Sequence, residues 1–548
     1  MRFALSVAVV MLFGSQAFAA DDPKSPAFPR RLLVVHASHY LYLNPLTHGT
    51  QGGADRVRDA ADRLAEGLRV PTAAGNNQLF VLADTLPASE ARFPTKEMIT
   101  KTLDSFIATT RAQDRVVVYF GAHAIEKDGK AYLVPVEGDL SDVNTLVPVS
   151  SIYAKLKDLE AAQKLVIWDV CRMNPERIRS RRDPGPMTEA LFKALSAAPY
   201  GIQALISCSP GEHSLEYSTP RGPAGLFAGS AFLDALRQAA ADDRSGNPKA
   251  TPNDAIPVDA LHKSAGKSLA AVAKQAGVVQ TPAQAGTPVK PETAYDPKEE
   301  PAKRFDWPTP KTAAADDVKA ILNELALPPL VAGEDALPAN FPFSAEALKN
   351  YPADATPDEI LMNADKYPLR VATLRAFQTV RDTWPLGKDA RGMTTLAAPV
   401  TDRAKKSVAA AQDQLALAIA QLELELENLL AVADKRATET KRWQAHYDYA
   451  VAEVRLRLVV FNELNVSLAK ARTETLPDLP PGGSGWRLVA SDKLQSGKAV
   501  QAIFTSATDD FTRLATAYKG TPWEVLAWRT LALQPGLRWE PIPVAKEK

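Results

Sequence analysis

Short apolar runs alternate with amphipathic segments in the first half of the chain. From about Pro29 to Gln238, each apolar run is bounded by polar or turn-forming residues, and the segments between the runs place apolar residues three or four positions apart. Continuously apolar strands separated by helices are typical of a mostly parallel sheet with helices on both faces. The pattern therefore predicts an α/β domain, with strands in RLLVVHA, NQLFVLAD, DRVVVYFGAHA, KLVIWDVC and IQALISCS.

The second half has the pattern of an all-α region. Residues 289–312 are rich in Pro, Lys and Glu and are predicted to be a linker. Residues 313–400 form a predicted small helical region, and residues 477–548 contain a predicted helical pair. Between them, residues 401–476 contain neither Pro nor Gly and carry apolar residues at the spacing of a coiled-coil seam. Because residues 434–442 are polar on all sides, this stretch predicts either one long helix or a helical hairpin.

Charge and the amino terminus add two expectations. The chain has 64 Lys plus Arg and 64 Asp plus Glu residues, so its net charge near zero favours neither nucleic acid nor an anionic membrane as a partner. Residues 1–19 have the basic start, short apolar core and Ala-Phe-Ala ending of a cleaved signal peptide. No later apolar run is long enough to span a bilayer. We therefore expect an exported protein, periplasmic or extracellular, without a transmembrane segment.

Two of the predicted strands end in residues that can carry chemistry. The third strand runs into Gly121 and His123, and the fourth ends in Asp169 and Cys171. The carboxyl ends of parallel strands meet at one edge of a sheet, where α/β proteins place their sites. An imidazole that takes the proton of a thiol makes it a nucleophile. The sequence permits a pair of His123 and Cys171 at this edge but does not prove one.

These stretches resemble the catalytic motifs of caspase-like peptidases, including bacterial metacaspase-like members. VVVYFGAHAIEKDGKAYLVP is similar to their histidine motif, and LVIWDVCRMNP is similar to their Asp-x-Cys motif in the form followed by Arg-x-Asn-Pro. Shorter resemblances lie in DAADRL, ISCSPGEHSLE, GLFAGSAFLDAL and QTPAQAG, so the similarity covers about residues 29–288. The resemblance implies the caspase fold and a cysteine-type endopeptidase that acts on proteins or peptides.

The resemblance also implies catalytic roles. Cys171 is expected to attack the scissile carbonyl, with His123 as general base and acid. The backbone N–H groups of Cys171 and Ala124 are expected to form the oxyanion hole. In the family, Ser and two glycines stand where this chain has Gly121, Ala122 and Ala124. If either alanine position requires a positive φ, alanine costs about 1 kcal/mol there.

A second set of residues is expected to recognise substrate. In metacaspases the Asp two residues before the catalytic Cys binds the substrate residue before the cleaved bond, and the resemblance implies this role for Asp169, with Gly121 and Cys208 nearby. Because a carboxylate pairs with guanidinium through two hydrogen bonds, cleavage after Arg or Lys is the expected preference. The loop that follows Cys171 would then be a candidate for self-cleavage, although a run of charges is more often only solvated. Its arginines include Arg179, Arg181 and Arg182.

The two cysteines and the remaining histidines leave alternatives open. In an oxidising compartment, Cys171 and Cys208 could form a disulfide that switches the enzyme off; the plainer alternative is that Cys208 only lines the pocket. His36, His39 and His48 lack a Cys or acidic partner at ligand spacing, so neither a metal nor another cofactor is expected. Activation by calcium stays open without a clear site.

A function of a different class also stays open. The caspase-like region could be a catalytically inactive scaffold, with the helical C-terminal half binding protein partners or further copies of the chain. The departures at Gly121, Ala122 and Ala124 are the sequence features that motivate this alternative.

Overall fold

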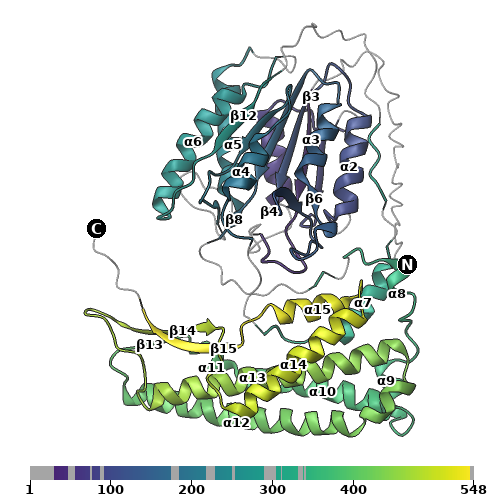
Figure 1. Cartoon of the computed structure of the whole chain (residues 1–548), viewed down its shortest axis with the longest axis vertical. Helices are drawn as coiled ribbons and strands as arrows, with labels where there is room; N and C mark the ends of the chain where they lie inside the picture. The colour runs from purple at the N-terminus through teal and green to yellow at the C-terminus, as the bar shows by residue number, and fades with distance from the viewer. Residues whose placement is uncertain are drawn as a thin grey trace, which may run out of the picture.

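The computed structural model describes residues 30–46, 56–74, 77–86, 90, 92–174, 184–217, 229–249, 254–288, 304–309, 312–330, 337–338 and 341–542. They form an α/β unit and a helical unit that lie against each other (Figure 1). The predicted signal peptide at residues 1–19 lies outside the described residues. So do three predicted site residues, Arg179, Arg181 and Arg182.

A six-stranded sheet forms the centre of the α/β unit. Its order is β12-β9-β7-β3-β1-β2, and all neighbours are parallel except β12, which is antiparallel to β9. The five parallel strands are those that the sequence pattern predicts, and every residue in them is buried. The strands are β1 (Arg30–His36), β2 (Leu79–Ala83), β3 (Arg115–Gly121), β7 (Gln163–Asp169), β9 (Gln203–Ile206) and β12 (Ala283–Gly286).

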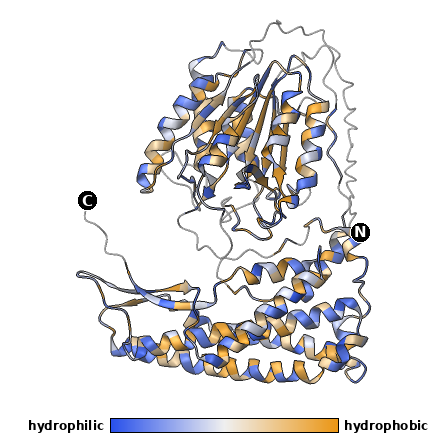
Figure 2. Ribbon diagram, viewed as in Figure 1, coloured by the Kyte–Doolittle hydropathy of each residue, from blue (hydrophilic) through white to orange (hydrophobic). Residues whose placement is uncertain are grey.

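Helices cover both faces of this sheet, as the pattern predicts. Each helix turns its apolar side toward the strands, as in α2, where Met98 and Phe106 are buried and Thr95 caps the first turn by accepting from the Met98 N–H. Figure 2 shows the apolar strands enclosed between these helices. One face carries α1 (Arg56–Gly67), α5 (Ala231–Gly246) and α6 (Val258–Gln275). The other carries α2 (Lys96–Ala108), α3 (Val149–Lys157) and α4 (Glu189–Ser196).

Short strands extend the carboxyl edge of the sheet and were not predicted. Two three-stranded sheets lie there, in the orders β4-β5-β6 and β11-β10-β8. The β4–β5 hairpin turns at Asp128 and Gly129, both with positive φ, and Asp-Gly is a common hairpin turn. The strands are β4 (His123–Lys127), β5 (Lys130–Val134), β6 (Val147–Pro148), β8 (Arg172–Met173), β10 (Ser214–Tyr217) and β11 (Gly229–Ser230).

The C-terminal half is helical, and residues 401–476 form a hairpin. Its helices are antiparallel, because the Tyr447 hydroxyl donates to the Leu429 carbonyl (3.0 Å) and the Gln412 amide donates to the Asn465 side chain (2.8 Å). The polar stretch that interrupts the seam is the turn. The helices of this half are α7 (Ala315–Glu324), α8 (Ala345–Leu348), α9 (Pro357–Met362), α10 (Pro368–Leu386), α11 (Lys388–Gly392), α12 (Asp402–Ala431), α13 (Lys441–Arg472), α14 (Lys498–Ala517) and α15 (Pro522–Leu531).

Two features of the C-terminal half differ from the pattern. A small antiparallel sheet joins β13 (Thr395–Ala397), β14 (Gly485–Ser491) and β15 (Gly536–Pro541). Part of the predicted linker packs on the α/β unit, with the Phe305 ring 4.2 Å from the Phe80 ring between centroids and Trp307 under the Arg92 guanidinium.

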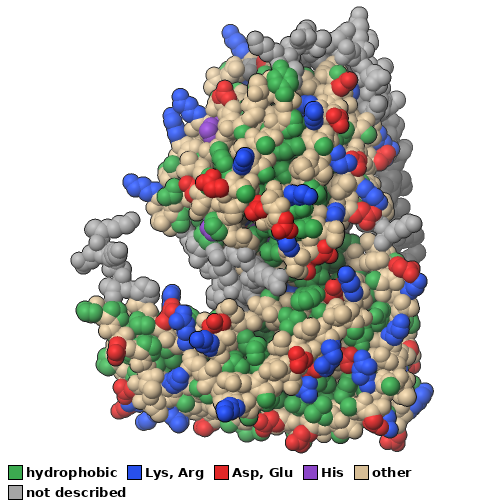
Figure 3. Space-filling model, viewed as in Figure 1, with side chains coloured by type: hydrophobic (Ala, Val, Ile, Leu, Met, Phe, Trp, Pro, Cys, Tyr) green, Lys and Arg blue, Asp and Glu red, His purple; other side chains and the backbone are tan. Residues whose placement is uncertain are grey.

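The described surface matches the balanced composition. On the face shown in Figure 3, acidic and basic side chains are interspersed over both units. None of the described helices has the combination of length and apolar character that crossing a membrane requires.

Candidate active site

His123 and Cys171 follow neighbouring strands at the same position. Gly121 on β3 faces Asp169 on β7 in register, and paired strands lie about 4.8 Å apart. His123 comes two residues after Gly121, and Cys171 comes two residues after Asp169. The parallel register therefore brings both chemistry-bearing residues to the carboxyl edge of the same two central strands.

The His123 imidazole is oriented by the loop that follows β1. Its Nε2 lies 2.8 Å from the backbone carbonyl oxygen of Asn44. Because a carbonyl oxygen only accepts hydrogen bonds, Nε2 carries the ring proton in the neutral imidazole, and Nδ1 is the basic nitrogen. The Tyr40 ring packs against the imidazole, with 4.7 Å between the ring centroids.

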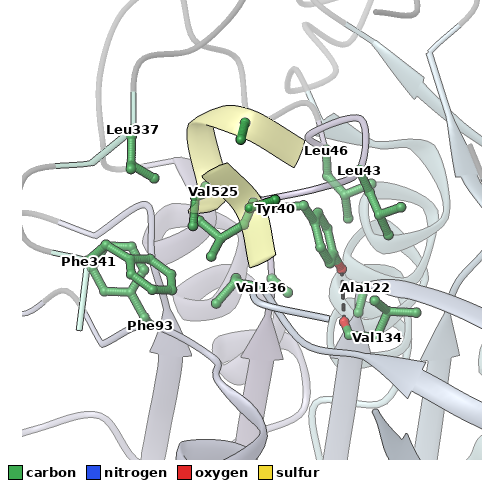
Figure 4. Close-up of a cluster of buried hydrophobic side chains, with 14 of the residues drawn as sticks. Tyr40, Leu43, Leu46, Phe93, Ala122, Val134, Val136, Leu337, Phe341 and Val525 are labelled. Atoms are coloured by element: carbon green, nitrogen blue, oxygen red, sulfur yellow. Dashed lines mark hydrogen bonds between the residues drawn. The ribbon is translucent and has the colours of Figure 1, made fainter. Parts of the chain in front are cut away.

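Tyr40 also fixes the backbone of His123. His123 and Val134 are partners in the β4–β5 register. The Tyr40 hydroxyl lies between them and accepts a hydrogen bond from the His123 N–H (2.7 Å). It donates one to the Val134 carbonyl (3.3 Å), as Figure 4 shows. The sequence showed only an aromatic residue in the loop after the first strand, so this role of Tyr40 was not predicted.

Cys171 has a left-handed backbone with a φ of 56°. For a residue other than glycine this conformation costs about 1–2 kcal/mol, and such strain is characteristic of functional sites. The Cys171 carbonyl is held by the N–H of Ser214 (3.0 Å) and by Nδ1 of His213 (3.3 Å). Ala122 and Ala124 do not have a positive φ. Alanine therefore carries no cost from a left-handed backbone at either of these two positions.

Asp169 lies beneath this edge and is fully buried. Its Oδ1 accepts a hydrogen bond from the Ser214 hydroxyl (2.8 Å), and its Oδ2 accepts one from the Tyr119 hydroxyl (2.5 Å). Burial, and next the Asp169 carboxylate, raise the pKa of Tyr119 well above its ordinary value, so Tyr119 keeps its proton and remains a donor.

Arg172 joins the same buried group, as sequence reasoning did not foresee. Its Nη2 forms an ion pair with Glu216 Oε1 (2.7 Å), and its Nε lies 3.9 Å from Asp169 Oδ2. Its Nη1 lies 2.7 Å from Nε2 of His36. Burial, and next the charge of Arg172, lower the pKa of His36 well below its ordinary value, so the His36 ring is neutral and accepts this hydrogen bond.

The packing of His36 explains the glycine at position 121. A Cβ on residue 121 would lie 2.7 Å from Cδ2 of His36 and 2.9 Å from Cε1 of Tyr119. A serine, the residue that the related motif carries, therefore does not fit here while the His36 ring keeps its place. The absence of a side chain at Gly121 leaves space for the His36 ring.

Cys208 is a buried thiol beside the strand that leads to Cys171. Its Sγ lies 3.7 Å from the Glu212 carbonyl and 4.0 Å from the Val170 carbonyl. Burial raises its pKa to about 12. The structure holds Cys171 and Cys208 as thiols, so the disulfide considered from the sequence is not formed. Cys208 has no exposed surface in this structure.

The site is covered in this structure. His123 exposes 2% of its surface and Cys171 exposes 1%. A peptide can therefore reach the thiol only after the surrounding chain moves. Among the residues that the structure describes, no group of three or more His, Cys, Asp or Glu side chains is placed to hold a metal ion.

Comparisons with known proteins bear on the α/β unit. Residues 47–288 match the family model of the caspase domain. No curated protein matches the chain. A crystal structure of the Drosophila initiator caspase Dronc is 14% identical and has a TM-score of 0.29, covering 48% of this chain and 81% of its own. Raptor from Chaetomium thermophilum is 12% identical with a TM-score of 0.23; the match covers 89% of this chain, which spans about half (53%) of Raptor's length.

The family model covers all the strands that carry the candidate site except β1. It also covers both motifs on which the resemblance in the sequence rests. The α/β unit of this protein is therefore a caspase-like domain.

Proposed function

We propose that this protein is a cysteine-type endopeptidase with Cys171 as nucleophile and His123 as general base and acid. The observation that carries the proposal is the parallel register of β3 and β7, which leads both residues to one edge, together with the Nε2 hydrogen bond of His123 to Asn44. Because this hydrogen bond places the ring proton on Nε2, Nδ1 is the nitrogen that can take the proton of the thiol.

The proposed reaction uses only groups of this chain and water. Nδ1 of His123 takes the thiol proton, and the Cys171 thiolate attacks the scissile carbonyl carbon. The imidazolium then protonates the leaving amine as the C–N bond breaks, which leaves a thioester on Cys171. Water, deprotonated by the neutral imidazole, hydrolyses the thioester and restores the thiol.

Two backbone N–H groups are proposed to stabilise the oxyanion. Residues along a β-hairpin alternate in the side toward which their N–H points. The His123 N–H points toward β5, where it meets the inserted Tyr40 hydroxyl. The N–H of Ala124 therefore points away from β5. Together with the N–H of Cys171, it is a candidate donor to the developing charge, and one such donor is worth roughly 3 kcal/mol.

The buried charges beneath Cys171 support a preference for Arg or Lys before the cleaved bond. Asp169 and Glu216 each carry a negative charge, whereas Arg172 carries one positive charge and His36 is neutral. A cationic substrate side chain that reaches the two carboxylates would be attracted to them, and this attraction is strengthened where water is excluded.

Peptide amides with Arg, Lys, Asp or Gly before the scissile bond test the proposal under reducing conditions. We expect turnover of the Arg and Lys substrates and its loss, by at least about 10³-fold, in Cys171→Ala. Cys208→Ala is the matched control, because it removes the other thiol and should retain activity. If the unmutated protein turns over none of these peptides, the result favours the alternative function, a catalytically inactive scaffold.

We also propose export and a binding role for the helical unit, on the sequence of residues 1–19 and on the separate helical half. Cell fractionation followed by N-terminal sequencing tests the first proposal, with Ala20 expected as the first residue of the mature protein. Size-exclusion chromatography with light scattering tests whether the chain binds further copies of itself.

A further inference from the structure

One arginine of the helical unit reaches into the caspase-like domain. Arg529 lies on α15 and exposes only 5% of its surface. Its Nε donates to the Leu41 carbonyl (2.9 Å), and its Nη2 donates to the Tyr40 carbonyl (3.4 Å). The guanidinium of α15 therefore holds two successive carbonyls of the loop of residues 37–46, called here the β1 loop.

The β1 loop is also the segment that orients His123. Tyr40 links the two contacts within one residue: its carbonyl accepts from Arg529, and its hydroxyl accepts from the His123 N–H. Asn44, four residues later, accepts from Nε2 of the same imidazole. Arg529 is thus connected to His123 through one tyrosine and one short loop.

The β1 loop has further contacts, and it borders a cavity. The loop is tied at its start by Asp84, which accepts from the N–H groups of Ser38 and His39, and by the Leu41 N–H, which donates to Val136. Figure 4 shows the helix that carries Val525, α15, beside Tyr40 of the loop. Beside this contact is a cavity of about 300 Å³, lined by Tyr42, Leu43, Asp139, Leu140, Trp528 and Leu531 among others. This cavity is the space next to Tyr42 and Leu43 into which that part of the loop can shift if the arginine releases it.

We propose that Arg529 is a positioning residue for the peptidase reaction, through which the helical unit sets the orientation of His123. The inference rests on the proposed function of Cys171 and His123. The two hydrogen bonds from α15 hold the backbone of Tyr40 and Leu41. Tyr40 and Asn44 in turn hold the His123 imidazole in place.

Arg529→Gln in the full chain tests this inference by two measurements. The first is the hydrogen exchange of the His123 Nε2–H, observed by NMR with ¹⁵N-labelled histidine and assigned with His123→Gln. We expect this proton to exchange at least about tenfold faster in Arg529→Gln. The second is peptide turnover, in which kcat should fall about 10- to 100-fold while KM changes by less than about twofold, because the reacting groups and not the substrate contacts are displaced.

Two further variants separate the inference from a general loss of structure. Arg529→Lys keeps the charge but not the planar pair of donors, so its effects should be intermediate. Arg513→Gln removes an arginine of α14 whose side chain is 72% exposed, and it should leave both measurements unchanged. An unchanged exchange rate of the His123 Nε2–H in Arg529→Gln would overturn the inference. If the unmutated protein lacks turnover, the proposed function fails. The exchange measurement still shows whether Arg529 controls the orientation of His123.

Discussion

The absence of a side chain at position 121 leaves room for the His36 imidazole. Nε2 of that ring accepts a hydrogen bond from the Arg172 guanidinium. The position of Arg172 among the buried charges beneath Cys171 therefore depends on the space that Gly121 leaves for His36. At this scale a residue matters for the space that it leaves as well as for the groups that it carries.

Gly121→Ala should disturb this arrangement. The new Cβ would meet the His36 ring at 2.7 Å, and a well-packed interior accommodates such a group at a cost of about 1–3 kcal/mol. Urea unfolding measures the loss. Gly246→Ala, at the end of α5 where a Cβ meets nothing within 4 Å, should be neutral within about 0.5 kcal/mol. Equal stability of Gly121→Ala and the unmutated protein would mean that the His36 ring is not fixed as described.

Glu137 provides a prediction for pH. Its carboxylate accepts from the N–H of Lys96 (2.8 Å), and burial raises its pKa to about 7. The folded state therefore binds more protons than the unfolded chain between about pH 4.5 and 7, so this residue makes stability fall as pH rises through that window. The free energy of unfolding of Glu137→Gln relative to the unmutated protein should increase by on the order of 2 kcal/mol from pH 5 to pH 8. A constant difference across this range would contradict the assignment.

At the scale of elements, the hairpin of α12 and α13 follows from a periodic seam with a polar interruption. Along α12, residues such as Leu415, Leu422 and Leu429 are fully buried against the rest of the helical unit. The polar stretch between the two halves of the seam cannot be buried without unsatisfied groups, so it becomes the exposed turn over Ala433–Thr438.

Two leucines of α12 test which side of the helix carries its stability. Leu422 is fully buried and Leu424 is 57% exposed. Leu422→Ala should lower the free energy of unfolding by about 2–5 kcal/mol, whereas Leu424→Ala should change it by less than about 0.5 kcal/mol. Urea denaturation followed by circular dichroism gives both values. Similar losses for the two variants would show that the seam is not where the burial places it.

At the scale of the whole molecule, the two units share one contiguous hydrophobic cluster. Phe341 and Val525 of the helical unit contact the caspase-like domain beside Phe93 and Tyr40 (Figure 4). The Phe93 and Phe341 rings meet edge to face, with 5.3 Å between their centroids. The helical unit therefore covers the carboxyl edge of the sheet, where the candidate site lies.

Phe341→Ala should weaken this contact. Removing a buried phenylalanine costs about 3–5 kcal/mol, and the loss should appear on both sides of the contact. Hydrogen exchange with mass spectrometry measures it, with faster exchange expected in the segment from Phe93 into α2. Tyr200→Ala, which removes a 76% exposed aromatic residue, is the control and should leave that exchange unchanged. Unchanged exchange in Phe341→Ala would mean that the two units are not coupled here.

The sequence by itself determined the five parallel strands, the covering helices and the strand ends that carry His123 and Cys171, because burial imposes a local period on apolar residues. It left open whether residues 401–476 form one long helix or a hairpin, and it did not indicate the contacts that Tyr40, Arg172, Glu216 and Arg529 make. These residues act through contacts between segments far apart in the chain, and no local period records such contacts. Only the tertiary structure decided that a carbonyl orients the imidazole, that the left-handed residue is Cys171, and that a helix from the other half of the chain holds the β1 loop.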